Sequence, residues 1–97
     1  MLKTLKPFYT TDKVLNLLSR FKGEFTSIHF SGNSINTTQY YSKFLAEASG
    51  NSIRFCNTYD ENYTSSIDIS DILHIGNYTE QIIITLSDFS VIIESEV

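Results

Sequence analysis

Several residue types are scarce in this sequence, and each scarcity excludes a class of protein. Cys56 is the one cysteine, so no disulfide can form within the chain and nothing indicates an oxidising compartment. Four glycines and one proline are too few for a collagen-like or proline-rich chain. No apolar run exceeds three residues, as at 82–84, whereas a membrane-spanning helix needs about 20. Lys3 and Lys6 precede no apolar signal core, so we expect a cytoplasmic protein.

Basic residues are missing from the C-terminal part of the sequence. Residues 1–54 contain all seven Lys and Arg together with three acidic residues, whereas residues 55–97 contain eight acidic residues and no basic one. The net charge of −4 therefore conceals a strongly acidic second part. Acidic surfaces repel phosphate backbones and attract basic partners. This asymmetry predicts a basic protein partner and argues against direct binding of nucleic acid.

The clearest predicted element is a helix near the N-terminus. The 97 residues, 41% of them hydrophobic, are enough for a single folded domain over residues 1–97. Within it, a Thr-Thr-Asp start is followed by apolar residues at i, i+3, i+4 and i+7 from Val14, and Gly23 suits the end of the last turn. This pattern predicts an amphipathic helix over residues 11–22.

Residues 38–49 fit either a helix or a strand. Tyr41, Phe44 and Leu45 have helical spacing, and Gly50 suits a helix end. The β-branched and aromatic residues that come earlier in this segment are also typical of a strand. Because most of its later residues are good helix formers, we predict a short helix here.

The remaining pattern is that of β-structure. A strand over residues 24–31 is predicted first, and the acidic part over residues 51–97 alternates apolar and polar residues, with a polar loop at 57–64. The sequence therefore predicts an α+β fold, in which the N-terminal helix packs on a mainly antiparallel sheet of five to seven strands. The alternative is a small, strongly bent β-barrel with an N-terminal helix.

Two isoleucines interrupt the alternation of the last two predicted strands. Ile82, Ile84 and Leu86 share one face of the first strand, but Ile83 lies on the other face, and Ile92 does the same on the second strand. A sheet face open to water carries polar residues at such positions. Ile83 and Ile92 therefore predict that the back of this hairpin is covered by a helix, by a partner or by a second copy of the chain.

No motif in the sequence indicates catalysis or metal binding. Residues 60–71 have oxygen-bearing side chains at the spacing of a calcium loop, but the sixth place is Ser65 instead of Gly and the twelfth is Asp71 instead of the longer Glu. Cys56 has neither a nucleophile motif around it nor a histidine close in sequence. We expect a non-enzymatic protein without metal or cofactor.

Tyrosines and acidic residues together suggest a protein-binding surface. The six tyrosines exceed what a small core buries with each hydroxyl satisfied, and tyrosine is favoured at protein interfaces. The predicted partner-binding residues lie between positions 57 and 80, namely Tyr59, Asp60, Glu61, Tyr63, Asp68, Asp71, Tyr78 and Glu80. The expected partner is a basic protein, and if that protein binds nucleic acid, these acids would occupy its phosphate sites.

In size, acidity and its Asn-, Ile- and Ser-rich composition, the chain resembles small inhibitors encoded by phages and mobile elements, anti-CRISPR proteins among them. The resemblance implies that binding inhibits a nucleic-acid-binding effector. Two alternatives remain. One is a self-associating structural module that pairs through Ile83 and Ile92. The other is a small nucleic-acid-associated regulator that uses a basic cluster in and before the helix, formed by Lys3, Lys6, Lys13, Arg20 and Lys22.

Overall fold

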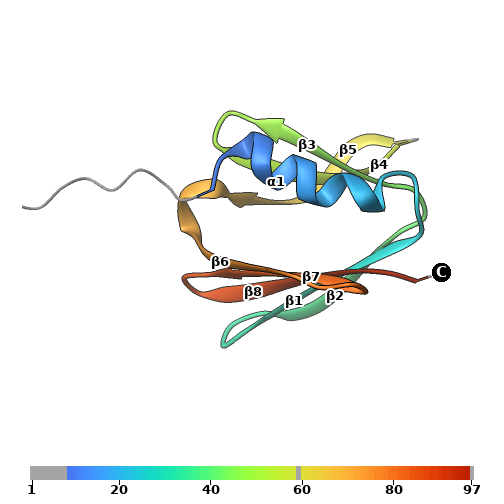
Figure 1. The fold of residues 1–97 in the computed structure, drawn as a ribbon. Coiled ribbons are helices and arrows are strands. Elements are labelled where there is room, and N and C mark those ends of the chain that lie inside the picture. The colour runs from blue at the N-terminus through green and yellow to red at the C-terminus, as the bar shows by residue number, and fades with distance from the viewer. Residues whose placement is uncertain (1–8, 59, 97) are drawn as a thin grey trace, which may run out of the picture.

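Two antiparallel β-sheets that face each other form the framework of the structure (Figure 1). The computed structural model describes residues 9–58 and 60–96, without the side chains of residues 60–64. The larger sheet has the strand order β2-β1-β8-β7-β6, and the smaller sheet has the order β3-β4-β5. The strands are β1 (Thr26–Gly32), β2 (Asn36–Tyr41), β3 (Phe44–Ser49), β4 (Ser52–Asn57), β5 (Asp60–Asp68), β6 (Ile72–Asn77), β7 (Gln81–Leu86) and β8 (Phe89–Ser95).

One short helix packs beside the smaller sheet. The helix α1 (Thr11–Leu18) continues into a 3-10 turn, η1 (Ser19–Phe21), so the predicted helix is confirmed. The hydroxyl of Thr10 accepts a hydrogen bond from the backbone N–H of Lys13 at 3.2 Å, which satisfies a free donor of the first turn. Gly23 has a φ of 78°, a left-handed conformation that costs glycine little, and it turns the chain toward β1. Within the described ranges, no helix is long and apolar enough to cross a membrane.

The predicted α+β fold is confirmed, and the barrel alternative is wrong for the described residues. The one described α-helix packs on mainly antiparallel sheet structure. The two sheets share no strand, and each keeps two free edges instead of closing on itself. The described chain has eight strands, more than the five to seven expected, because segments predicted as helix and loop are also extended.

The helix predicted over residues 38–49 is wrong. This segment contains the end of β2 and all of β3, and the chain crosses from the larger sheet to the smaller one between Tyr41 and Phe44. Both side chains are almost completely buried, and their rings pack edge to face with centroids 5.6 Å apart. A helix would bury these two residues on one face. The crossing buries them from two different layers, and pairing with β1 and β4 satisfies the backbone.

The polar loop predicted at residues 57–64 is also wrong over most of its length. Strand β5 begins at Asp60 and pairs with β4, although the register shifts twice near Cys56. Its first residues are polar and lack an alternating apolar pattern, and pairing with β4 accounts for their extended backbone. The same extended backbone does not wrap around a cation as a calcium loop does.

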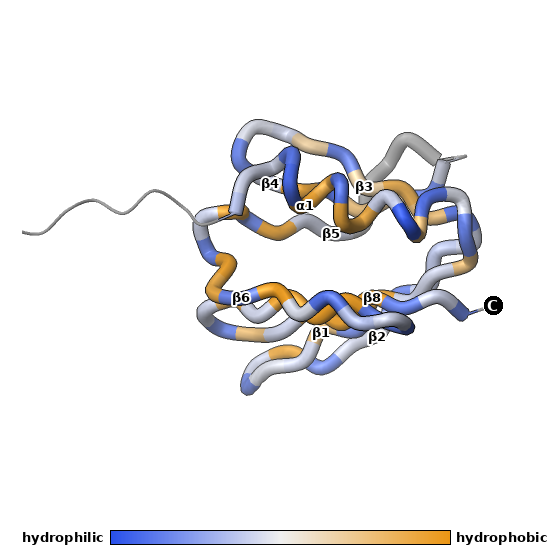
Figure 2. Tube along the Cα trace, viewed as in Figure 1, coloured by the Kyte–Doolittle hydropathy of each residue, from blue (hydrophilic) through white to orange (hydrophobic). Residues whose placement is uncertain are grey.

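The buried apolar side chains of the described residues form a hydrophobic cluster with members from the helix and from both sheets. Figure 2 shows apolar residues along the strands of both layers. The alternation predicted for the last hairpin is confirmed, since Ile82, Ile84, Val91 and Ile93 are fully buried. Phe44 lies among other aromatic rings, with centroid distances of 6.4 Å to Phe21, 5.6 Å to Tyr41 and 5.9 Å to Phe55. Its ring therefore contacts the helical turn, the larger sheet and the smaller sheet.

We predict that Phe44→Ala lowers the free energy of unfolding by about 3–5 kcal/mol, because it leaves a cavity where the layers meet. Urea unfolding followed by circular dichroism measures the effect. Leu73→Ala is the control, since this side chain is 66% exposed and its removal changes the free energy by no more than about 0.5 kcal/mol. Equal destabilisation by the two variants would contradict the packing described here.

Candidate functional site

Charged residues are divided unevenly between the two sheets. The five strands of the larger sheet contain one charged residue, Glu94. The described basic residues lie outside the larger sheet, in α1, in η1 and the connection after it, before β3 and in β4, namely Lys13, Arg20, Lys22, Lys43 and Arg54. Acidic residues flank the strands of the larger sheet at both ends, so the ends of this sheet are where its negative charge gathers.

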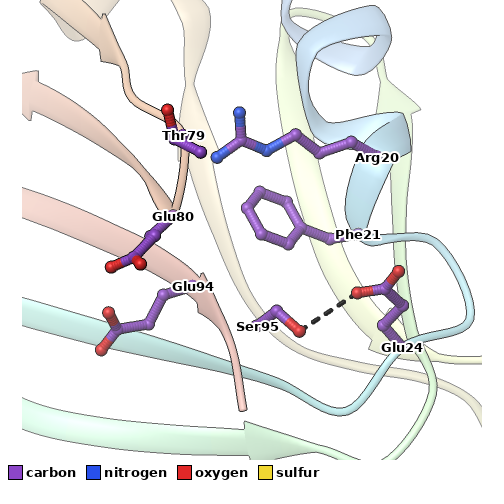
Figure 3. Close-up of a pocket in the computed structure, with 7 residues that line it drawn as sticks. All are labelled: Arg20, Phe21, Glu24, Thr79, Glu80, Glu94 and Ser95. Atoms are coloured by element: carbon purple, nitrogen blue, oxygen red, sulfur yellow. Dashed lines mark hydrogen bonds between the residues drawn. The ribbon is translucent and has the colours of Figure 1, made fainter. Parts of the chain in front are cut away.

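An acid-lined pocket of about 530 Å³ opens at one end of the two layers (Figure 3). It lies where η1 approaches the β6–β7 turn and the end of β8. The residues that line it are Arg20, Phe21, Glu24, Thr79, Glu80, Glu94 and Ser95. These residues include one cation, three carboxylates and one aromatic ring, and we call the space that they line the acid-lined pocket. In Figure 3, Glu80 and Glu94 lie together on one side, and Glu24 lies on the other side near Ser95.

Arg20 forms the basic wall of the pocket and is held by two contacts. Its guanidinium donates a hydrogen bond from Nη1 to Oδ1 of Asn77, at the end of β6, at 2.8 Å. The same group lies 4.7 Å from the centroid of the Phe21 ring, within the range of a cation–π interaction. Figure 3 shows the side chain extending from the helical side toward Thr79. Arg20 thus links η1 to the larger sheet.

The three carboxylates come from three separate elements. Glu24 lies in the connection between η1 and β1, and its Oε1 accepts a hydrogen bond from the hydroxyl of Ser95 at 3.1 Å. Glu80 is exposed in the β6–β7 turn, and Glu94 pairs with Gln81 across β8 and β7. Among the described residues, no ion pair joins Arg20 to any of these carboxylates. Their charge therefore remains available to a ligand.

Carboxylates arranged in this way can accept hydrogen bonds from ammonium or guanidinium groups. Such charge-assisted bonds are about twice as strong as neutral ones. The described side chains offer no group of three or more His, Cys, Asp or Glu that could hold a metal ion. The carboxylates that line the pocket are thus hydrogen-bond acceptors for a cationic group.

The structure divides the predicted partner-binding residues between two ends of the molecule. Asp68 and Asp71 are exposed at the passage from β5 to β6, whereas Tyr78 and Glu80 are exposed in the turn after β6. Strand β6 has six residues, so the two groups are about 20 Å apart. Tyr59 and the side chains of three further candidates, Asp60, Glu61 and Tyr63, lie outside what the structure describes.

Sequence reasoning missed two carboxylates of the pocket, Glu24 and Glu94. Their positions are far from Glu80 along the chain, and neither belongs to a motif. They meet because β1 pairs with β8 and β8 pairs with β7, which aligns the ends of these strands. The one available signal was that each glutamate stands at the boundary of a predicted strand.

The cysteine and the histidines do not form a nucleophilic site. Cys56 is buried in the smaller sheet, where its Sγ contacts the carbonyl oxygen of Leu45 at 3.6 Å and Oε1 of Glu47 at 3.5 Å. His29 lies in the larger sheet and shares a 2.7 Å hydrogen bond with the hydroxyl of Thr38. His74 lies in β6 of the same sheet. The thiol and the imidazoles therefore belong to different layers.

Comparisons with protein-family models, with curated proteins and with solved structures find no match to this chain.

We predict that Arg20→Gln destabilises the fold by about 1 kcal/mol, because it removes the hydrogen bond to Asn77 that links two layers and the contact with the neighbouring Phe21 ring. Lys22→Gln is the matched control, since it removes the same charge two residues further along from an exposed side chain. Urea unfolding of both variants measures the difference. A larger loss for Lys22→Gln would contradict the role given to Arg20.

Proposed function

We propose that the protein is a non-enzymatic interaction protein, and that its acid-lined pocket binds a positively charged region of a protein partner. One observation carries the proposal: Glu24, Glu80 and Glu94 come from separate elements and line one pocket. The strands of the larger sheet contain no Lys or Arg that could neutralise them. An arginine or lysine side chain of the partner supplies the complementary charge.

Tyr78 supports a protein partner over a small cation. Its side chain is 54% exposed and lies in the same turn as Glu80, beside the pocket. An exposed tyrosine next to carboxylates offers both contact area and a hydroxyl, a combination that is favoured at the centre of protein interfaces. The binding surface thus extends from the pocket onto the β6–β7 turn.

Inhibition is the consequence we propose for a partner that binds nucleic acid. Carboxylates seated against the basic groups of such a partner occupy positions that phosphates would take, so binding of this protein and of nucleic acid exclude each other. We also propose a cytoplasmic location, because the one cysteine, Cys56, is a buried thiol and a reducing compartment keeps it so.

The proposal predicts that the protein binds a peptide of nine arginines and that reversal of charge at the pocket weakens this binding. In Glu24→Lys/Glu80→Lys, two lysines repel the peptide, and the dissociation constant rises about tenfold or more, which corresponds to about 1.4 kcal/mol. Fluorescence anisotropy of a labelled peptide measures the constant. Added salt weakens binding to the unaltered protein, because the attraction is between exposed charges.

Asp68→Lys/Asp71→Lys is the matched control for the charge reversal. It changes the net charge by the same amount at the opposite end of β6. Each double variant also removes one carboxylate that accepts a hydrogen bond from a serine hydroxyl. Ser52 donates to Asp68 at 2.6 Å, and Ser95 donates to Glu24 at 3.1 Å. We expect this variant to bind the peptide with a dissociation constant within about threefold of the unaltered protein's, because the site is local. Equal weakening in both variants would show that net charge, and not the pocket, attracts the peptide.

A further inference from the structure

The larger sheet has one face toward the core and one face away from it. In Figure 1, α1 and the smaller sheet lie above the larger sheet, and no described element lies below it. The pairing register places alternate residues of all five strands on this lower side, which we call the outer face. Its residues are Ser27, His29 and Ser31 of β1, Asn36, Thr38 and Tyr40 of β2, His74 and Gly76 of β6, Gln81, Ile83 and Thr85 of β7, and Ser90, Ile92 and Glu94 of β8.

Charge is almost absent from the outer face. Glu94 is its one acidic residue, and it contains no Lys or Arg. Exposed sheets ordinarily carry charged side chains, which keep them solvated and prevent association. Depletion of charge together with exposed tyrosine and phenylalanine is instead typical of the centre of a protein interface. The composition of this face is therefore that of a surface that becomes covered.

Apolar side chains occupy the centre of the outer face. Ile92 is the middle residue of β8, which is the middle strand of the sheet, and Ile83 lies directly opposite it on β7. Both remain partly accessible in the single chain. A central apolar pair surrounded by serine, threonine and histidine matches the arrangement of an interface with a hydrophobic core and a polar rim.

Aromatic residues lie at both lateral edges of the same end of this face. Tyr40 on the edge strand β2 is 62% exposed and packs against Phe25, which is 45% exposed, with ring centroids 6.2 Å apart. On the other edge, the Tyr78 ring lies over Gly76, where an added Cβ would meet Cε2 of the ring at 2.6 Å. The register joins the two edges through one row of residues from Tyr40 across the sheet to Gln81.

The outer face is large enough for a stable dimer. Five strands about 4.8 Å apart and seven residues that rise about 3.3 Å each give a face of about 24 Å by 23 Å, or about 550 Å². Two such faces in contact bury about 1,100 Å² even before the relief of the side chains is counted. A specific interface needs about 1,000 Å² in total.

We propose that the outer face binds the outer face of a second copy of this chain, giving a two-fold symmetric dimer of face-to-face sheets. A two-fold axis through the centre of the face and along β8 sets Ile92 of one copy against Ile92 of the other. The same axis brings β2 over β6 of the second copy, so Tyr40 and Phe25 lie over its Tyr78. The dimer does not depend on the function proposed for the acid-lined pocket.

Charge favours a second copy over the basic partner at this face. A basic partner gains little from a surface with one carboxylate, whereas the acidic ends of the sheet attract it. Two copies, each with a net charge of −4, repel each other at a distance, and the outer face is where their close approach brings the fewest like charges together. The dimer therefore tightens when salt is added, in contrast to peptide binding at the pocket.

Light scattering coupled to gel filtration tests the dimer. The unaltered chain is run over a concentration series from about 1 µM to about 100 µM, which covers dissociation constants typical of modest interfaces. We expect the mass to rise from 11.1 kDa to twice that value, and to rise at lower protein concentration when salt is added. A mass of 11.1 kDa at every concentration and salt level overturns the proposal.

Three variants identify the face. Ile83→Lys places a charge at its centre. Tyr40→Lys places a charge at its edge, at a side chain exposed enough for the substitution to leave the folded chain intact. Each raises the dimer dissociation constant about tenfold or more. Ile35→Lys, in the turn between β1 and β2, makes the same change of charge outside the face and leaves the dimer unchanged. A dimer that survives both face variants overturns the proposal, because the copies then meet elsewhere.

Discussion

The ring of Phe44 packs where the helical turn and the two sheets meet. It contacts Phe21 of the helical turn, Tyr41 of the larger sheet and Phe55 of the smaller sheet, and its exposed fraction is zero. A chain of this size has little apolar surface to bury, so stability depends on joining both sheets and the helix to one core. The backbone of Phe44 is also bonded to the η1–β1 connection: the N–H of Gly23 donates to the carbonyl of Phe44 at 2.8 Å, and the N–H of Phe44 donates to the carbonyl of Glu24 at 3.0 Å.

This packing also accounts for where charge can lie. The core-facing residues of the larger sheet are apolar, and its outer residues are almost all uncharged, so acidic residues are confined to the ends of its strands. At one end η1 approaches the sheet, and Arg20 links the two, which leaves the acid-lined pocket between them. The end of the sheet suits a basic partner, and its face suits an uncharged one. The two proposed interactions thus use adjoining surfaces that share Glu94 and Tyr78, and they respond to salt in opposite ways.

The sequence predicts the parts of the fold that depend on local pattern, and it fails where pairing decides. The helix from Thr11 onward follows from its cap and spacing, and the buried residues of the last hairpin follow from alternation. Tyr41 and Phe44 have a spacing that fits a helix as well as a crossing between layers, so only the three-dimensional structure separates the two. Strand β5 begins among polar residues that have no alternating pattern, and hydrogen-bonded pairing with β4 explains its extended backbone.

The candidate site was predictable only in part. Glu80 and Tyr78 stand out because they lie in an acidic, tyrosine-bearing part of the sequence. Glu24 and Glu94 join them through the antiparallel pairing of β1, β8 and β7, which no local pattern specifies. The same pairing shows why Asp71, close to Tyr78 in sequence, belongs to the other end of the molecule, since an extended strand separates the two residues.

Affinity capture with three baits tests the central claim, that the acid-lined pocket binds a basic protein. The baits are the unaltered protein, Glu24→Lys/Glu80→Lys and Asp68→Lys/Asp71→Lys, each incubated with nuclease-treated lysate of the source organism or its host. We expect the first and third baits to retain the same stoichiometric basic protein, which salt releases, and the second bait to lose it. Two outcomes would contradict this claim: all three baits retain the protein, or the unaltered bait retains no basic protein.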